Sequence, residues 1–400
     1  MGFFVKISQN AKNAIWIGSL CSISYLAVYI ARNILSAVTP QMIEGGYSEA
    51  YIGRISSLYF VCYAVGQLVN GTIGDKIKAK YMISLGLLGA GVTGIVFSRV
   101  ADFPVTATIV YGLTGYFLSM IYGPMTKVVS ENTEPIYTTR CSLGYTFASF
   151  FGTPMAGFFA ALFAWRTAFS VTSIFLFLMS ALGFVFFTLY ERKGIVQYGK
   201  YCKQERGIGN IKVLFRYRIV KFSLVALITG IVRTSVVFWL PTYISQYLEF
   251  PAKTAVSIFT VATFVISCTT FIAVFVFERL KQDLDKTMLV MFVSSSVFFL
   301  LSYFVKAPIP NVIFMVLAIM GSNGAASMLY GKYCPSLRDT GMVSSVTGFI
   351  DFLSYLSAAA ANIIFANAAT SIGWGNLILV WFCIVFMGVL LSLPFSKRRV

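Results

Sequence analysis

Twelve long apolar runs, separated by short polar segments, constrain the fold of this chain more than any other feature. A helix needs about 20 apolar residues to cross the hydrocarbon core of a bilayer, and each run has about that length. Charged residues make up only 11% of the 400 residues, too few to cover the surface of a soluble globule. We therefore expect an all-α membrane protein with twelve transmembrane helices. The expected spans are 15–40, 52–74, 81–99, 104–128, 140–163, 166–190, 219–246, 254–277, 286–305, 310–331, 341–366 and 373–394.

The polar residue content excludes several classes of protein. The net charge is +17, but the basic residues lie in short segments between apolar runs and form no extended soluble patch that would suit nucleic acid. The chain has no histidine, and its seven cysteines are scattered without a CxxC pair. Neither a nucleophile–base pair nor a set of metal ligands is visible. We expect no enzyme, no cofactor, no metal site and no nucleic-acid partner.

The distribution of lysine and arginine predicts how the chain is oriented in the membrane. With the N-terminus placed inside, the inside segments hold 24 of the 31 basic residues and the outside ends hold five. Basic residues favour the cytoplasmic side of a membrane. The sequence therefore predicts a multi-pass protein of the cell membrane, surrounded by lipid, with both termini in the cytoplasm.

The longest polar stretch, 191–218, predicts a cytoplasmic linker between two halves of six helices, 1–190 and 219–400. The halves also show traces of an internal repeat. Arg32 and Pro40 in the first run correspond to Arg233 and Pro241 in the seventh, at an offset of 201 residues. Such matched positions are typical of two parallel repeats related by an axis along the membrane normal. One chain is enough for a complete path between the halves, so we expect a monomer.

Only three ionisable residues lie deep inside the expected spans: Arg32, Arg233 and Asp351. A charge at the centre of a spanning helix costs about 2.5–3.5 kcal/mol and persists where it meets a partner or a water-filled path. The two arginines occupy matched places, and the spans offer one acid for two positive charges. We expect the missing negative charge to come from the substrate, because a guanidinium group binds phosphate or carboxylate through a planar fork.

Polar residues at helical spacing extend the predicted site to four spans. Each set shares one face of its helix, and the alternative interpretation for each is hydrogen bonding between packed helices. The sets are Tyr25, Tyr29, Arg32 and Ser36 in the first span, Tyr63, Gln67 and Asn70 in the second, Tyr145 and Ser149 in the fifth, and Thr347, Asp351 and Tyr355 in the eleventh.

A charged turn follows the second span. Gly74 is followed by Asp75 and Lys76 on the expected cytoplasmic side. A carboxylate there can accept hydrogen bonds from the N-terminus of a neighbouring helix. We expect Asp75 and Lys76 to take part in a gate that closes this side of the path.

Three segments of the chain resemble the organophosphate:phosphate antiporters of the major facilitator superfamily, which include bacterial glycerol-3-phosphate and hexose-phosphate transporters. These segments are residues 25–33 (YLAVYIARN) ahead of Pro40, the Tyr63 span that ends in Gly74-Asp75-Lys76, and Arg233 ahead of residues 240–243 (LPTY). The resemblance implies a rocker-switch carrier that exchanges a phosphorylated metabolite for inorganic phosphate. It implies that Arg32 and Arg233 bind the phosphoryl group, with further site roles for Tyr25, Tyr29, Tyr63 and Tyr355.

The chain also departs from that family. The glycerol-3-phosphate members have a lysine where this chain has Gln67 and a histidine near the place of Ser149, which argues against glycerol 3-phosphate as the substrate. Asp351 stands at a position that is uncharged in those members. An extra acid near two arginines favours a less charged anion or a substrate with many hydroxyl groups.

Three roles are open for Asp351, and two other functions compete with the exchanger. The carboxylate can pair with an arginine in the empty site, carry a proton for coupled transport, or bind an amine or hydroxyl of the substrate. The first competing function is a proton-coupled organic-anion symporter that uses Asp351. The second is a sensor that binds sugar phosphate without transporting it.

Overall fold

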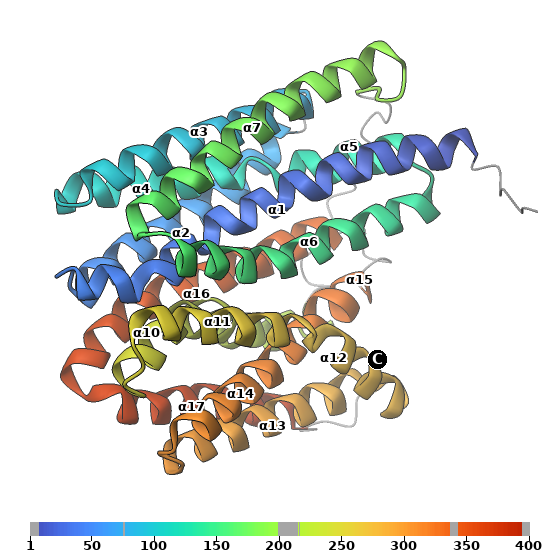
Figure 1. Cartoon of the computed structure of the whole chain (residues 1–400). Coiled ribbons are helices and arrows are strands. Elements are labelled where there is room, and N and C mark those ends of the chain that lie inside the picture. Colours follow the sequence, from blue (N-terminus) through green and yellow to red (C-terminus); the bar gives the residue numbers. More distant parts are fainter. Residues whose placement is uncertain (1–7, 75–76, 199–214, 216, 337–342, 394–400) are drawn as a thin grey trace, which may run out of the picture.

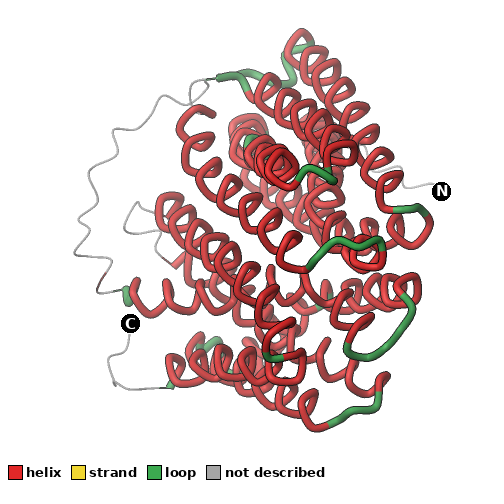
Figure 2. The backbone as a smooth tube through the Cα atoms, turned by 90° about the vertical axis from the view of Figure 1, so that its left-hand side faces the viewer, coloured by secondary structure: helices red, strands yellow, loops and turns green. Residues whose placement is uncertain are grey.

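The computed structural model describes residues 8–393 apart from 75–76, 199–214, 216 and 337–342. These residues form helices joined by loops, with no strand among them (Figure 2). The helices before the predicted linker, which we call the first part, are α1 (Gln9–Glu44), α2 (Glu49–Gly74), α3 (Ala79–Val100), α4 (Pro104–Ser119), α5 (Tyr122–Asn132), α6 (Pro135–Leu162) and α7 (Trp165–Arg192). Those after the linker, which we call the second part, are α9 (Ile219–Gly230), η1 (Ile231–Val236), α10 (Val237–Gln246), α11 (Ala252–Ser267), α12 (Thr269–Arg279), α13 (Leu284–Phe304), α14 (Pro308–Met328), η2 (Leu329–Tyr333), α15 (Cys334–Ser336), α16 (Val343–Ser371) and α17 (Gly373–Ser392).

The prediction of an all-α membrane protein with twelve spanning helices is confirmed. Eleven helical stretches in the described part of the chain are long and apolar enough to cross a membrane. The remaining helix is α6, which is 28 residues long and apolar over Phe151–Leu162. Helices suit this environment because every backbone group is satisfied within the segment, where no water is available. Some spans consist of consecutive segments, such as α9, η1 and α10.

The fourth span contains a break that the sequence analysis did not predict. The apolar run 104–128 was expected to form one helix, but α4 ends at Ser119 and α5 begins at Tyr122. Pro124 explains the break, because its ring lacks an N–H and clashes with the carbonyl four residues earlier, at Met120. The break brings Tyr122 to the first position of α5.

The prolines of the predicted repeat, and one tryptophan near the start of the last helix on each side of the predicted linker, lie at comparable places in their helices. Pro40 lies inside α1 and Pro241 lies inside α10. Trp165 begins α7, and Trp374 is the second residue of α17. The predicted linker, 191–218, falls mainly on residues outside the described part of the chain.

Helices of the two parts pack side by side along several seams (Figure 1). Within the first part, α1 packs on α6, α2 on α4, and α3 on α7; within the second, α13 packs on α14 and α17. Across the molecule, α2 lies against α16, α6 against α11, and α1 against α10. Glycine permits close approach of such helices, since a Cβ atom at Gly152 of α6 would lie 2.2 Å from the Cβ of Tyr29 on α1.

One end of the bundle is joined across the two parts, and we call it the closed end. There Gln246 at the end of α10 donates a hydrogen bond of 2.6 Å to Glu49 at the start of α2. The indole of Trp374 donates to the same glutamine at 2.9 Å. The backbone N–H of Ala252 donates to Glu44 at 3.2 Å. These contacts hold the ends of α1 and α2 against α10, α11 and α17.

At the opposite end, the ion pairs in the described ranges lie within each part. Glu191 at the end of α7 accepts from Lys78 and Lys80, each at 2.5 Å. Asp285 in α13 accepts from Arg218 at 2.5 Å and from Lys221 at 2.8 Å. The two ends of the bundle therefore differ in how their parts are linked.

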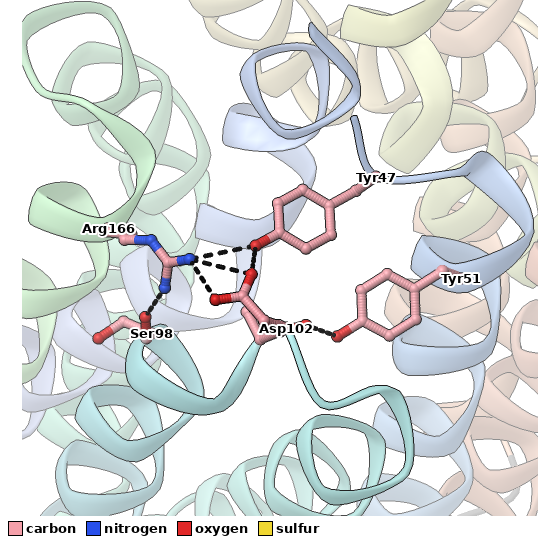
Figure 3. A network of polar contacts seen from close by, with 6 residues as sticks. Tyr47, Tyr51, Ser98, Asp102 and Arg166 are labelled. Carbon is pink, nitrogen blue, oxygen red and sulfur yellow. Dashed lines mark hydrogen bonds and ion pairs between the residues drawn. The ribbon is translucent and has the colours of Figure 1, made fainter. Parts of the chain in front are cut away.

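A polar cluster ties the loop between α1 and α2 to the start of α7 and to the end of α3 (Figure 3). Arg166 at the start of α7 pairs with Asp102 at 3.0 Å and donates to the backbone carbonyl of Ser98. Tyr47, in the loop between α1 and α2, donates a hydrogen bond to the same aspartate. Tyr51 donates to the backbone carbonyl of Ala101 at 2.5 Å. The cluster therefore fixes the loop between α1 and α2. Glu44 and Glu49, on either side of this loop, accept the hydrogen bonds from the second part.

This cluster predicts a pH-dependent contribution to stability. The hydrogen bond from Tyr47 and the ion pair with Arg166 lower the pKa of Asp102, and burial raises the pKa of Tyr47 to about 12. A depressed carboxyl pKa stabilises the fold above pH about 4, and this stabilisation is lost as the pH falls through the depressed value. We expect Asp102→Asn to lower the thermal midpoint of the detergent-solubilised protein slightly at pH about 7 and to have less effect at pH about 3. A difference between the two proteins that stays constant across this range would contradict the assignment.

Candidate functional site

Arg32 lies in the middle of α1 and points across the molecule toward α16. Its Nη1 atom donates a hydrogen bond of 2.7 Å to the hydroxyl of Tyr355. The guanidinium carbon lies 4.7 Å from the centre of that ring and 5.3 Å from the rings of both Tyr29 and Tyr63. Phe60 completes the enclosure at 5.7 Å. Arg32 of the first part is thus held by a tyrosine of the second.

These neighbours hold the arginine without neutralising it. Among the described residues no carboxylate lies within ion-pair distance of Arg32. Aromatic faces attract a cation by about 0.5–2 kcal/mol each, which orients the group and leaves its full charge in place. Packing fixes the enclosure, because Tyr63 and Tyr355 are buried and meet edge to face at 5.0 Å. The site therefore presents an oriented positive charge.

Arg233 lies in η1 and has an acidic neighbour. Its Nη2 atom is 3.8 Å from Oδ1 of Asp351 on α16, close enough for an ion pair but too long for a hydrogen bond. The guanidinium group also lies 5.2 Å from the ring of Tyr330, whose hydroxyl is 3.0 Å from the hydroxyl of Ser354. The Arg233 and Asp351 side chains keep 33% and 28% of their surface exposed, so a ligand can reach both.

Two irregular helical segments carry this second group of residues. Arg233 lies in the π-helical segment η1, and Tyr330 lies in the π-helical segment η2. Such segments are rare and are frequent at functional sites, because the widened turn redirects side chains. Neither segment follows from the apolar pattern of the sequence. Their coincidence with Arg233 and Tyr330 supports this region as the candidate site.

The structure gathers most of the predicted site residues in one region. Asp351 lies 3.8 Å from Arg233, and Tyr355, one turn further along α16, accepts the hydrogen bond from Arg32, so α16 brings the two arginine groups together. Tyr25 contacts the ring of Tyr29 at 5.0 Å. Together Arg32, Arg233 and Asp351 carry one excess positive charge, because they comprise two guanidinium groups and one carboxylate.

The structure gives less information on four other predicted residues. Gln67 of α2 and Ser149 of α6 are partly exposed. Asp75 and Lys76, the predicted gating pair, lie outside the described residues. Ser36 shares the helix of Arg32, but its hydroxyl donates to the backbone carbonyl of Phe238 at 2.6 Å and so joins α1 to α10.

Sequence reasoning missed several residues of this region. Tyr330 and Ser354 support Arg233, Phe60 covers Arg32, and Tyr122 extends the tyrosine cluster. Tyrosines in apolar runs were a usable signal for two of them. The spacing of Tyr330 and Tyr122 did not indicate a place in the site. A π-helical segment sets the direction of Tyr330, and a helix break sets that of Tyr122.

The chain matches a known family model. The model described as Major Facilitator Superfamily matches residues 21–362. The chain is also similar to the "Membrane sensor protein UhpC" of Escherichia coli strain K12, at 30% identity over 84 residues, 21% of this chain and 18% of that protein. It is 26% identical over 110 residues to a "Probable hexose phosphate transport protein" of Chlamydia pneumoniae, 27% of this chain and 24% of the relative. The match thus covers about a fifth to a quarter of the length of these curated relatives.

Solved structures resemble the fold over nearly the whole chain. A D-xylose-proton symporter aligns with a TM-score of 0.73 at 12% identity, covering 96% of this chain and 97% of that one. A bacterial homolog of the human lysosomal transporter Spinster, in an inward-facing and occupied conformation, aligns with a TM-score of 0.75 at 11% identity, covering 94% and 96%. At these identities the likeness concerns the fold alone.

Proposed function

The chain belongs to the major facilitator superfamily, and on that premise we propose that this transporter carries a phosphorylated organic anion in exchange for inorganic phosphate, by alternating access. The observation that carries the proposal is the placement of two guanidinium groups, one on α1 and one on η1, which both contact residues of α16: Arg32 donates to Tyr355, and Arg233 lies 3.8 Å from Asp351. Phosphate monoesters carry nearly two negative charges and three acceptor oxygens at neutral pH. Two arginine side chains therefore suit a phosphate monoester better than they suit a neutral substrate.

Arg32 and Arg233 come from different parts of the molecule, and this placement supports an alternating-access cycle. A phosphoryl group between Arg32 and Arg233 would bridge α1 and η1 and would draw the two parts together. In the empty site one positive charge is unbalanced, and moving it through a closed, dry intermediate is costly. Reorientation with a ligand should therefore be faster than reorientation without one. Exchange follows from this difference.

The relatives support the choice of substrate class. The Chlamydia pneumoniae relative has a name that states hexose phosphate transport. We place this chain in the cell membrane as a monomer, with both termini cytoplasmic, because basic residues are concentrated in the corresponding loops. In this orientation the closed end faces the outside of the cell.

Purified protein in lipid vesicles tests the exchange. We expect uptake of labelled phosphate to be fast when the vesicles contain unlabelled phosphate or a sugar phosphate, and slow when they contain neither. Uptake that does not depend on internal phosphate would contradict exchange. Saturable binding of a sugar phosphate without any flux would instead favour a sensor, the role stated in the name of the Escherichia coli relative.

Replacing Asp351 by asparagine separates the exchanger from a proton-coupled symporter. In the exchanger the carboxylate 3.8 Å from Arg233 competes with phosphate, so its removal should tighten phosphate binding. A partly solvated ion pair contributes about 1 kcal/mol, which corresponds to about fivefold in affinity. Isothermal titration of phosphate into both proteins measures this change. A symporter would show uptake driven by a pH gradient in the wild-type protein and no such uptake in Asp351→Asn.

A further inference from the structure

Glu44 is the last residue of α1, and its charge does not suit that position. The final carbonyl groups of a helix give its C-terminal end a partial negative charge, which favours basic residues there and disfavours acidic ones. The last turn of α1, which is described in full, holds no basic residue to compensate. The α1 helix alone therefore gives no reason for a glutamate at its end.

The start of α11 has the opposite mismatch. The helix begins at Ala252 after Pro251, which has no side-chain acceptor, and the described first turn contains no acidic residue. The exposed Lys253 adds a positive charge to an end that already carries a partial positive charge. The first N–H groups of a helix also have no partner within it. This end of α11 therefore needs a negatively charged acceptor from elsewhere.

The two mismatches compensate each other at the closed end. The backbone N–H of Ala252 donates to the Glu44 carboxylate at 3.2 Å. Ala252 is only 3% exposed, so its surroundings leave little room for water to replace the carboxylate. Glu44 gains at the start of α11 the positive environment that α1 lacks, and α11 gains its missing acceptor.

Each side of this contact is anchored in its own part of the molecule. Gln41, one turn before Glu44, donates to the backbone carbonyl of Ala160 on α6 at 2.5 Å. On the other side, the N–H of Phe250 donates to the carbonyl of Ile244 at 3.4 Å, and α11 packs on α10. The end of α1 therefore moves with the first part and the start of α11 with the second. Separation of the parts at this end breaks the contact.

We infer that Glu44 is an electrostatic latch that favours closure of this end of the bundle. The inference rests on the alternating access of the proposed function and not on its substrate. With the end closed, the carboxylate complements α11; with the end open, it lies only beside the unfavourable end of α1. Glu49 differs, because it begins α2 and suits its own helix in both states. The effect of Glu44 thus depends on the state of the carrier.

Hydrogen exchange of the purified full-length protein, without added ligand, tests the latch. Glu44→Gln keeps an acceptor for the Ala252 N–H but removes the charge, so the open population should rise about two- to fivefold, and Glu44→Lys should raise it about tenfold. Amides of residues 53–60 in α2, which packs on α16, should exchange faster by the same factors, because exchange follows the population of the opened state.

Salt gives a second readout, which the loss of a neutral hydrogen bond would not affect. Glu44 is exposed, and the screening length falls to about 3 Å at about 1 M salt. High salt should therefore speed exchange of residues 53–60 in the wild type and remove its difference from Glu44→Gln. A difference that is the same at low and high salt would overturn the electrostatic latch.

Glu278→Lys is the matched control. Glu278 is exposed and is the second-last residue of α12, so the same change of charge is made near a helix C-terminus inside the second part. Exchange of residues 53–60 should stay at the wild-type rate in this variant. An equal effect in both lysine variants, or faster exchange confined to the start of α11, would overturn the latch. Because no ligand is present, its failure would leave phosphate exchange unaffected, and a protein that exchanges no phosphate could still show the latch.

Discussion

Arg32→Lys and Arg233→Lys are each expected to reduce phosphate exchange about 100-fold, although both substitutions keep the positive charge. A lysine offers a point charge in place of a planar fork and cannot bind two phosphate oxygens side by side. Losing one charge-assisted hydrogen bond costs about 1.5–3 kcal/mol, and about 1.36 kcal/mol corresponds to tenfold in rate. Exchange of labelled phosphate in vesicles measures the effect, and titration of phosphate separates binding from movement.

Arg54→Lys is the matched control for these two variants. Arg54 lies near the start of α2 and is exposed, so the same chemical change there should leave exchange within about twofold of the wild type. If either site variant kept more than half of the wild-type rate, a specific role for that guanidinium group would be wrong. Folding is checked by comparing thermal midpoints, because a lost enclosure of Arg32 could also disturb the contact between α1 and α16.

The two arginines should differ in how they tolerate a neutral replacement. Arg233 shares its charge with Asp351, so Arg233→Gln leaves a carboxylate without its nearest cation. Arg32 contacts tyrosines instead. If it is replaced by a neutral residue, the Tyr355 hydroxyl can bond to water, and no charge is left without a partner. Adding Asp351→Asn to Arg233→Gln should therefore restore thermal stability and not exchange. This difference follows directly from which side chains contact each arginine.

The sequence allowed the spans and the buried charges to be predicted because both have a strong physical signal. A run of apolar residues long enough to cross the bilayer has few alternative folds. A charge inside such a run is costly enough to need an explanation, which singled out Arg32, Arg233 and Asp351. Helical spacing then placed Tyr29 beside Arg32, and the structure has their ring and guanidinium group in contact. Periodicity within one helix was sufficient for this step.

Periodicity within one helix could not predict contacts between helices or changes in helix geometry. The hydrogen bond from Arg32 to Tyr355 joins residues 323 positions apart, and no spacing rule relates them. Tyr330 contacts Arg233 from a π-helical segment, and Tyr122 contacts Tyr25 from a helix that begins where Pro124 breaks the span. In each case the direction of the side chain depends on a local departure from the regular helix. Apolar periodicity carries no information about such departures.

The closed end depends on a feature that sequence patterns also hide, the absence of a side chain at Gly53. In α2 this glycine lies against α16, and a Cβ atom there would be 2.6 Å from the Cβ of Ala366 and 2.9 Å from the backbone carbonyl oxygen of Asn362. Both distances are below normal contact, and one partner is backbone that cannot rotate away. The close approach of α2 and α16 at this end is therefore possible only with glycine.

Gly53→Ala should accordingly block closure of this end and lower exchange at least about tenfold, with phosphate binding little changed. Overpacking costs about 1–3 kcal/mol, equal to a shift of about 5- to 150-fold in the equilibrium between closed and open states. Paired cysteines in place of Glu49 and Gln246, whose long side chains meet end to end at 2.6 Å, report closure by reaction with a short bifunctional thiol reagent, which spans more than a disulfide can. We expect efficient cross-linking with Gly53 and poor cross-linking with alanine.

Gly348→Ala provides the control for this experiment. Gly348 also lies in a helix, α16, and a Cβ atom added there has no heavy atom within 4 Å. Both substitutions raise helix propensity by about 1 kcal/mol, so only the steric contact differs between them. Unchanged exchange and cross-linking in Gly348→Ala, with loss of both in Gly53→Ala, would tie transport to closure of this end. Normal exchange in Gly53→Ala would mean that α2 and α16 do not need this contact during the cycle, and the closed end would then not be a gate.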